Sequence, residues 1–171
     1  SEELRWYLGI YGAATIFSTL MLLPRYHGFW EALRYGSFQV ASVMSTTGYA
    51  TADFNLWPVA VKMVLLLVMI VGGCAGSTAG GIKVVRTALL FKLGRREIRH
   101  TFQPRKVQVV RINNRPVSEV VLENTNAYLA AYASILVFSF LVLSIDGFTT
   151  TTNFTAVLSC FNNIGPGLEA V

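Results

Sequence analysis

The stretch Ser45-Thr46-Thr47-Gly48-Tyr49 decides the fold of this chain. It is polar and lies between two strongly apolar segments, so it suits neither a membrane-spanning helix nor a surface loop. The pattern instead predicts a re-entrant segment, in which a short helix enters the membrane and an extended strand returns. Non-helical backbone at membrane depth is tolerated only where it is buried in protein or lines a water-filled cavity.

The returning strand is expected to act as a cation filter. It would follow a pore helix over residues 29–44 and cover residues 45–52, with Gly48 near its centre. Glycine has no Cβ and reaches positive φ at little cost, so the strand can turn its carbonyl oxygens towards an aqueous axis. The predicted filter residues are Thr46, Thr47, Gly48 and Tyr49.

A second copy of this arrangement follows later in the chain. Aligning Gly165 with Gly48, at a separation of 117 residues, also aligns one valine pair and one serine pair. Each copy follows a long apolar segment, and a repeated supersecondary unit is the signature of a modular fold. The threonines at 149–152 can cap and begin a second pore helix over residues 153–161. The second filter strand is then predicted to contain Asn163, Ile164, Gly165 and Pro166.

The composition indicates an integral membrane protein. The chain is 53% hydrophobic and 13% charged, and its mean hydropathy is +0.51. Uncharged runs cover residues 6–23, 63–82 and 127–145, and each is close to the ~20 residues that cross a ~30 Å hydrocarbon core. We therefore predict an all-α integral membrane protein with repeated helix–pore loop–helix units, re-entrant pore helices and one broken transmembrane helix.

Basic residues concentrate in one segment. Ten of the 14 Lys and Arg residues lie within residues 83–115. Because cytoplasmic loops carry an excess of Lys and Arg, residues 83–115 are expected to be cytoplasmic. The net charge of +5 therefore reports membrane topology rather than a nucleic-acid site. Within the segment, β-rich residues 107–112 and residues 115–117 flank Asn113-Asn114, a pattern that predicts a small hairpin.

The stretch Gly72-Gly73-Cys74-Ala75-Gly76-Ser77-Thr78-Ala79-Gly80-Gly81 breaks the helical pattern after Pro58. Each glycine costs a helix roughly 1 kcal/mol relative to alanine. Glycines at every fourth position also fit a helix-packing face, but the glycine pairs at both ends exceed what packing needs. A phosphate-binding loop is excluded because Ile82 stands where that motif requires lysine. We predict a true interruption, with a helix resuming over residues 82–93.

Residues that could support catalysis or metal binding are few. Cys74 and Cys160 lie in apolar sequence, which is typical of small buried thiols rather than of a disulfide or a metal pair. The apolar part contains no paired carboxylates, no Ser-His-Asp set and no cluster with metal-ligand spacing. We therefore expect that the chain is not an enzyme and that it uses no organic cofactor.

The expected organisation has three parts. Residues 1–93 form a complete helix–pore loop–broken helix unit, residues 94–119 form a cytoplasmic basic loop with the possible hairpin, and residues 120–171 begin the next unit. The last part contains a helix, a pore helix and a filter, and it stops where a following helix is expected. Because the chain also starts without methionine, we expect it to be a fragment of a longer polypeptide.

These motifs resemble the Trk/Ktr/HKT superfamily of potassium transporters, and most closely its bacterial Trk-type potassium uptake proteins. The resemblance rests on the first filter stretch, on the glycine-rich stretch followed by Ile82-Lys83, and on Asn162-Asn163-Ile164-Gly165-Pro166-Gly167. It covers nearly the whole chain. The family builds its pore from four such units in one polypeptide, and this chain resembles the third unit and most of the fourth.

The resemblance implies a function and partners. It implies a pore-forming subunit in the bacterial inner membrane, surrounded by lipid, which conducts potassium and is completed by the other repeats of the same polypeptide. Similar proteins are homodimers that bind a cytosolic nucleotide-binding regulator of the TrkA type. Potassium would be held by the carbonyls of Thr47, Gly48, Ile164 and Gly165. The family's intramembrane gate loop would correspond to Gly72, Gly73, Gly76, Ser77, Thr78, Gly80, Gly81 and Lys83.

One alternative function stays open at this point. A broken membrane helix is also typical of alternating-access, cation-coupled secondary transporters, in which it forms the substrate site. The two classes differ in permeation, because a carrier saturates at low turnover and couples to an ion gradient, whereas a pore shows unitary currents.

The charge pattern predicts the orientation of the chain in the membrane. Cysteines introduced at Gln108 and Asn114 should resist an impermeant thiol reagent in intact cells, because the surrounding basic residues hold the segment on the cytoplasmic side. A cysteine at His27, in the expected outer loop, is the labelled control, with Cys74 and Cys160 first replaced. Labelling of the 108 and 114 positions from outside would overturn the orientation.

Overall fold

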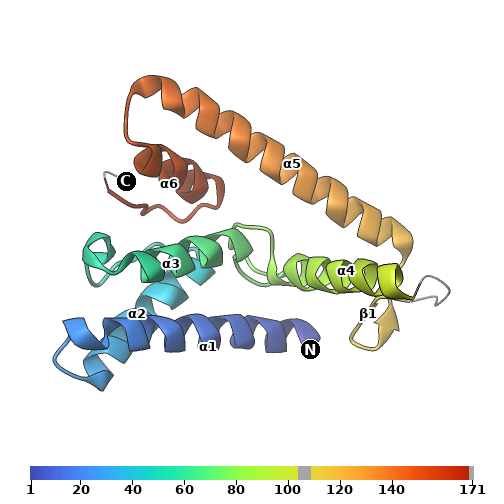
Figure 1. The fold of residues 1–171 in the computed structure, drawn as a ribbon, viewed down its shortest axis with the longest axis horizontal. Coiled ribbons are helices and arrows are strands. Elements are labelled where there is room, and N and C mark those ends of the chain that lie inside the picture. Colours follow the sequence, from blue (N-terminus) through green and yellow to red (C-terminus); the bar gives the residue numbers. More distant parts are fainter. Residues whose placement is uncertain (104–108, 170–171) are drawn as a thin grey trace.

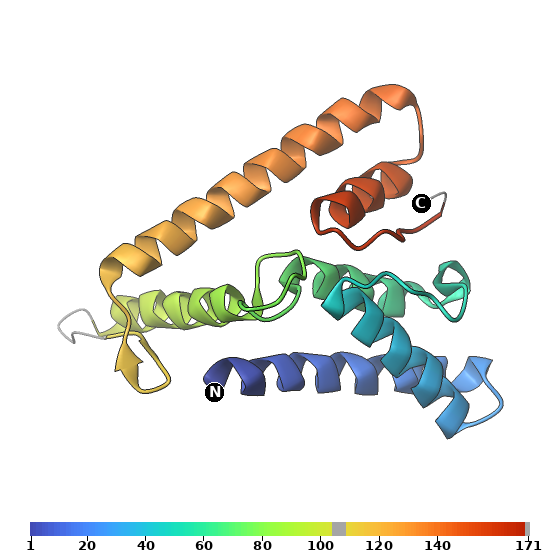
Figure 2. The ribbon, with the colours of Figure 1, turned by 180° about the vertical axis from the view of Figure 1, so that it is seen from behind.

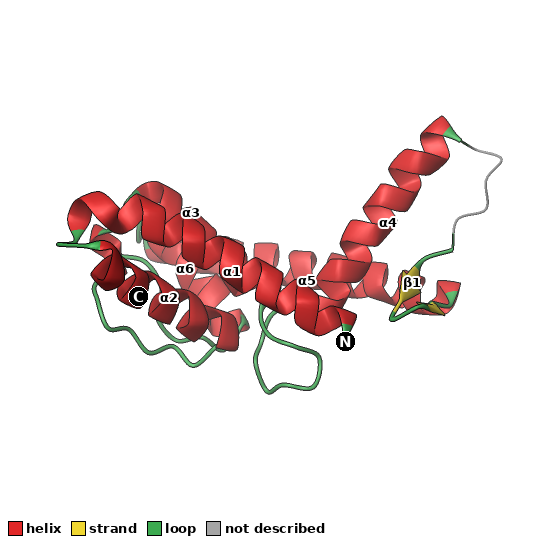
Figure 3. Ribbon diagram, turned by 90° about the horizontal axis from the view of Figure 1, so that it is seen from below, coloured by secondary structure: helices red, strands yellow, loops and turns green. Residues whose placement is uncertain are grey.

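The computed structural model describes residues 1–103 and 109–169, and this part of the chain is mainly helical (Figures 1 and 3). The α-helices are α1 (Glu2–Leu22), α2 (Phe29–Ser45), α3 (Val59–Val71), α4 (Val84–Phe102), α5 (Glu119–Leu143) and α6 (Thr150–Phe161). Short 3-10 turns occupy Leu23–Arg25, Phe54–Leu56 and Ser144–Asp146, and two strands, β1 (Arg111–Ile112) and β2 (Arg115–Pro116), form a small hairpin.

In the part of the chain that the structure describes, two helical segments are long and apolar enough to cross a membrane, Glu2–Arg25 and Glu119–Asp146. The helix α3 is also apolar but shorter, with 13 residues. α1 lies against α2, α3 and α4, whereas α5 contacts α4 and α6 (Figures 1 and 2). The main core joins α1, α2 and α3 through Leu22, Val40, Val43, Met44 and Val61, each with 0% exposure.

The re-entrant pattern is present in both halves. α2 ends at Ser45 with Thr46 as a left-handed cap, one residue beyond the predicted end of the first pore helix. α6 begins three residues earlier than expected because Thr149, and not a later threonine, is the N-cap. The Thr149 hydroxyl accepts a hydrogen bond from the Thr152 amide at 3.2 Å, which satisfies one of the helix's free N–H groups.

The broken helix is also present, but its second half differs from the prediction. α3 stops at Val71 and α4 begins at Val84, so residues 72–83 interrupt the helical path between them (Figure 1). α4 then continues to Phe102, past the expected end at Leu93, so the boundary drawn at residue 94 falls inside a helix. Gly94 costs about 1 kcal/mol, and the good helix formers that follow it, Arg95 and Arg96 among them, offset this cost.

The hairpin lies where the basic segment predicted one, and it is fastened to the rest of the chain. Ile112 pairs with Arg115, and both turn residues, Asn113 and Asn114, have positive φ (50° and 63°). Two positive φ values in a two-residue loop are the hallmark of a type I′ turn, which asparagine tolerates. The Glu2 carboxylate accepts from the Asn113 amide at 2.9 Å. Val107 and Gln108, part of the predicted first strand, lie outside the described residues.

The thiols differ from the prediction of two buried cysteines. Both are free, but Cys74 is partly exposed and Cys160 is exposed. Cys160 lies on α6, whose helical neighbours in the described part of the chain are chiefly α5 and α3. One face of α6 is therefore uncovered, and apolar sequence around a cysteine does not reveal which face that is.

The close contact between α1 and α2 yields a stability prediction. A Cβ placed on Gly36 would lie 3.5 Å from the Thr19 amide nitrogen and 3.6 Å from the Ser18 Cβ, whereas nothing lies within 4 Å of a Cβ on Gly12. Gly36→Val should therefore overpack the helix pair and destabilise the protein by about 1–3 kcal/mol. Thermal unfolding in detergent measures this, and Gly12→Val is the control with the same change in helix propensity. Equal melting temperatures for the two variants would contradict the packing.

Candidate functional site

The two re-entrant segments share one backbone geometry at equivalent positions. In the first, the amides of Thr46 and Thr47 donate to Val43 O at 3.2 Å and Ser42 O at 3.0 Å. In the second, 117 residues later, the amides of Asn163 and Ile164 donate to Cys160 O at 3.2 Å and Ser159 O at 3.0 Å. The repeat seen in the sequence is therefore a structural repeat of the helix C-terminus and its exit strand.

Backbone angles repeat as well. Thr46 and Gly48 have φ of 57° and 74°, and Asn163 and Gly165 have φ of 54° and 102°. The residue between each pair, Thr47 or Ile164, does not have positive φ. Each exit strand thus alternates the sign of φ over consecutive residues, unlike a regular β-strand, in which φ stays negative.

The two exit strands meet at Gly48. A Cβ on Gly48 would lie 1.9 Å from the carbonyl oxygen of Ile164 and 3.0 Å from Cδ of Pro166. Contacts this short do not occur with real side chains, so only glycine fits at this point. The structure therefore brings together the predicted filter residues of both copies, although they are more than 100 positions apart in sequence.

Hydrogen bonds to the pore helices hold each strand. The Ser42 hydroxyl donates to Tyr49 O at 2.6 Å, which ties the end of the first strand back to α2. In the second copy, the Thr155 hydroxyl on α6 accepts from the Leu168 amide at 3.1 Å. The equivalent of Ser42, Ser159, has a buried hydroxyl without a partner in the described part of the chain. The two strands are thus fixed by different side chains.

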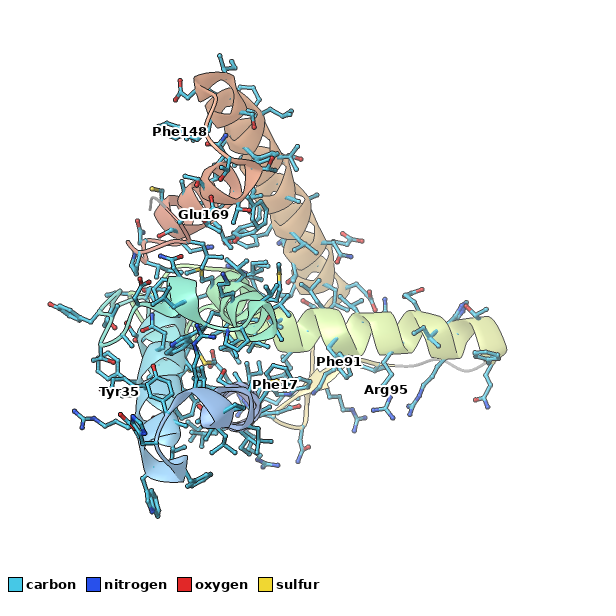
Figure 4. All side chains as sticks on the ribbon, turned by 60° about the vertical axis from the view of Figure 1, so that its left-hand side comes forward. Phe17, Tyr35, Phe91, Arg95, Phe148 and Glu169 are labelled. Atoms are coloured by element: carbon cyan, nitrogen blue, oxygen red, sulfur yellow. The ribbon has the colours of Figure 1, made fainter. Side chains whose placement is uncertain are left out.

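The segments that follow the two exit strands make contacts that the sequence analysis did not foresee. The Glu169 amide donates to Asn55 Oδ1 at 2.7 Å, which links the ends of the two re-entrant segments. The Glu169 carboxylate accepts from the hydroxyls of Thr149 and Thr152, and these hydrogen bonds lower the pKa of Glu169 (Figure 4 labels Glu169 beside α6). The only signal in the sequence that could have predicted these contacts is the position of Asn55 and Glu169 just after the two exit strands.

The glycine-rich segment between α3 and α4 is a closed loop. At its base, the amides of Ile82 and Lys83 donate to Ile70 O and Val71 O, each at 3.0 Å, and the Val84 amide donates to Gly73 O at 3.0 Å. These bonds satisfy carbonyls that the end of α3 would otherwise leave unpaired. Gly72 approaches Gly80 so closely that a Cβ there would lie 2.2 Å from the Gly80 carbonyl oxygen.

Charged side chains bind the tip of this loop, away from its base. The Lys83 ammonium donates to Ser77 O at 2.9 Å and to Ala79 O. The Glu3 carboxylate, from the first turn of α1, accepts from the Ala75 amide at 2.6 Å. Residues 75–78, which include Ser77 and Thr78, are exposed, and nothing lies within 4 Å of a Cβ placed on Gly76.

The loop also contacts the C-terminal ends of both pore helices. The Gly80 amide donates to the Thr46 hydroxyl at 3.3 Å. A Cβ on Gly80 would lie 2.0 Å from the carbonyl oxygen of Asn162, the residue that caps α6. Asn162 is itself fixed, since its side-chain oxygen accepts from the Tyr132 hydroxyl at 2.9 Å. The predicted filter and the predicted gate loop are therefore in direct contact.

The chemistry of the site is that of backbone carbonyls and hydroxyls. Among residues 1–103 and 109–169, no three His, Cys, Asp or Glu side chains come together as a metal-binding group. Oxygen ligands of this neutral kind suit a weakly held monovalent cation better than a tightly bound divalent one, which favours carboxylates.

Known proteins are similar to this chain in sequence and in fold. Residues 30–169 match the TrkH family, described as "Cation transport protein". The chain is 35% identical to the Trk system potassium uptake protein TrkH of Salmonella typhimurium over 99% of its length. It is 36% identical to TrkG of Escherichia coli over 78% of its length. It spans 35% and 27% of these two relatives.

A solved structure gives the same result. The crystal structure of the potassium transporter TrkH from Vibrio parahaemolyticus superposes with a TM-score of 0.92 at 33% identity, over 98% of this chain and 36% of that one. Agreement of this quality over nearly every described element fixes the fold as that of an all-α membrane transport protein. The chain belongs to the TrkH family of cation transport proteins.

Proposed function

We propose that this chain forms two of the filter segments and the gate loop of a potassium uptake pore. Potassium would be bound by the carbonyls of Thr47, Gly48, Ile164 and Gly165. Flanking residues Thr46, Tyr49, Asn163 and Pro166 would complete the two filter segments. The observation that carries this proposal is the repeated exit strand at the ends of α2 and α6, with the two copies meeting at Gly48.

The alternating φ values supply the physical reason. In a regular strand, successive peptide groups face opposite sides, so only every second carbonyl could face an ion. Reversing the sign of φ at Thr46 and Gly48, and at Asn163 and Gly165, counters this alternation and turns consecutive carbonyls towards one side. A row of such carbonyls can replace the hydration shell of a potassium ion.

The pore helices add a favourable field. α2 and α6 both end at the inner side of the exit strands, and the C-terminal end of a helix carries about half a negative charge. Two such ends that face one cavity stabilise a cation there without binding it tightly. A site of this kind allows the ion to leave again, which conduction requires.

We also propose that residues 72–83 form the gate. Gly80 contacts both Thr46 and Asn162, so the loop would lie directly on the cytoplasmic side of the filter. The exposed residues Ser77 and Thr78 would offer further oxygen atoms. The Lys83 ammonium would oppose the passage of a cation while it stays bound to the loop carbonyls. Withdrawal of the loop would remove both obstacles.

We also propose the partners that the resemblance to Trk-type uptake proteins suggests, and the topology that the charge pattern suggests. A cytosolic nucleotide-binding regulator of the TrkA type would bind the complete subunit, and two copies of that subunit would form a dimer in the bacterial inner membrane. The cytoplasmic segment would be narrower than residues 83–115. The Lys83 amide donates a hydrogen bond to the carbonyl of Val71 at the end of α3, so the backbone of Lys83 would lie inside the apolar region. The exposed basic segment would then begin near Lys92.

The filter proposal predicts the effect of a side chain at Gly48. In the complete transporter, Gly48→Ser should lower the potassium-to-sodium permeability ratio on the order of tenfold. A Cβ at this position would lie 1.9 Å from the Ile164 carbonyl oxygen, so it would displace one of the proposed potassium ligands. A loss of about 1.4 kcal/mol of preference for potassium corresponds to about tenfold in the ratio. Reversal potentials in potassium–sodium gradients measure the ratio. Gly94→Ala, where a Cβ meets nothing within 4 Å, is the control. If Gly48→Ser keeps the potassium-to-sodium permeability ratio of the parent protein, the assignment of Gly48 to the filter is wrong.

The gate proposal predicts a difference between two glycines of one loop. Gly80→Ala places a Cβ against the Asn162 carbonyl and should push the loop out of the pathway, whereas Gly76→Ala meets open space. We expect potassium uptake into proteoliposomes to rise several-fold in Gly80→Ala and to become less dependent on the cytosolic regulator. Gly76→Ala should behave as the parent. Equal uptake by both variants, with both proteins folded, would indicate that the loop only packs.

A further inference from the structure

The end of α4 and the hairpin enclose a strongly basic pocket that the conduction pathway does not use. Its volume is about 300 Å³. It lies on the α4 end remote from the glycine-rich loop, where Figure 1 shows α4 extending beyond the N-terminus of α1. The residues that line it are Lys92, Arg95, Arg96, Arg99, Val109, Val110 and Arg111.

Carboxylates neutralise only part of this pocket. Glu2 pairs with Lys92, and Glu119 pairs with Arg96 at 2.9 Å. Glu97 also approaches Arg96, at 3.4 Å. Within residues 1–103 and 109–169, no carboxylate lies within ion-pair distance of the other three lining arginines, which are Arg95, Arg99 and Arg111. The pocket therefore retains a positive charge that an anion can balance.

The depth of the pocket matches the membrane surface. The 13 residues of α3 span about 20 Å of a hydrocarbon core of about 30 Å. The remaining ~10 Å corresponds to the first seven or so residues of α4, which brings the chain to Phe91. The Phe91 ring lies 5.4 Å from the ring of Trp6, and aromatic residues of this kind mark the interface. Arg95 and Arg99 follow one and two turns beyond it.

Exposed apolar residues accompany these arginines. Phe91 is 60% exposed and Ile98 is 62% exposed. Phe91, Arg95 and Ile98 share one face of α4 because helical residues three and four positions apart are neighbours. Figure 4 shows Phe91 and Arg95 projecting from the same side of the helix. A face that mixes arginine with large exposed hydrophobic residues is typical of a helix that contacts a lipid interface rather than water alone.

We propose that this pocket binds the phosphate headgroup of an anionic phospholipid. Guanidinium groups hold phosphate oxygens in paired hydrogen bonds, and Arg95, Arg99 and Arg111 supply three of them around one cavity. Phe91 would contact the glycerol and the first part of the acyl chains, and Ile98 would lie beside the headgroup. Basic residues at the cytoplasmic surface gain attraction from anionic lipids, and basic pockets beside membrane helices are suited to anionic headgroups.

The test compares two pairs of arginines in the complete protein. The double variant R95Q/R99Q removes two charges from the pocket. The control R25Q/R34Q removes two exposed charges far from the pocket, one just after the C-terminal end of α1 and one in the first half of α2. Each protein is purified in detergent and titrated with phosphatidylglycerol or phosphatidylcholine, and the bound lipid is counted by native mass spectrometry. We expect R95Q/R99Q to bind phosphatidylglycerol about tenfold or more weakly than the parent, and R25Q/R34Q to match the parent.

Further arms distinguish the lipid from other anions. Inorganic phosphate at millimolar concentration should not displace the lipid, and phosphatidylcholine should bind parent and variant equally. If the double variant does not fold, the single variants R95Q and R99Q should each weaken phosphatidylglycerol binding about threefold.

Three outcomes would overturn the proposal. Equal phosphatidylglycerol binding by the parent and by R95Q/R99Q would remove the pocket as a lipid site. Full displacement by inorganic phosphate would make it a site for a soluble anion. Unchanged lipid binding together with lost binding of the cytosolic nucleotide-binding regulator would make it a protein-docking surface.

Discussion

Inside a membrane every backbone polar group needs a partner within the protein, and this requirement shapes the irregular parts of the chain. The backbone leaves the α-helix in the apolar region at the two exit strands and at the loop between α3 and α4. The strands are held by amides that donate back to their own pore helices. The loop closes on itself, because Ile82 and Lys83 donate to the last carbonyls of α3. Each departure from the helix is therefore closed locally.

Local closure lets three irregular segments approach one another without competing for hydrogen bonds. Gly48 touches the Ile164 carbonyl, and Gly80 touches the Asn162 carbonyl. Both contacts are between backbone atoms, so any side chain at either glycine would separate the segments. The two glycines thus set the distance between the two exit strands and the distance between the end of α6 and the loop. Carbonyl oxygens that are free of side-chain cover remain available to an ion.

The sequence predicted the local features because each depends on a few neighbouring residues. The first pore helix was predicted over 29–44 and is Phe29–Ser45, since a polar run and a left-handed cap end it. The break after α3 and the Asn113-Asn114 turn were predicted from glycine and asparagine chemistry. The continuation of α4 through Gly94 was missed, because the cost of one glycine is smaller than the combined preference of the residues around it.

The sequence could not predict the contacts between distant segments. Glu3 to Ala75, Glu169 to Asn55 and Gly80 to Asn162 each join residues that no periodic pattern relates. The exposure of Cys160 was missed for a similar reason, because it depends on which helices cover α6. Only the internal repeat gave long-range information, since it aligned Gly165 with Gly48 and placed the two exit strands in equivalent surroundings.

The first turn of α1 joins the hairpin to the loop between α3 and α4 through adjacent carboxylates. Glu2 binds Lys92 and the Asn113 amide, whereas Glu3 binds the Ala75 amide of the loop. The Glu2–Lys92 pair is about a quarter exposed, with side-chain exposures of 27% and 26%, so it contributes at most about 1 kcal/mol. The loop base is held by three backbone hydrogen bonds in an apolar environment, where breaking them costs more. A force on the end of α4 therefore releases the hairpin contacts before it opens the loop base, and the loop base moves with α4 as one piece.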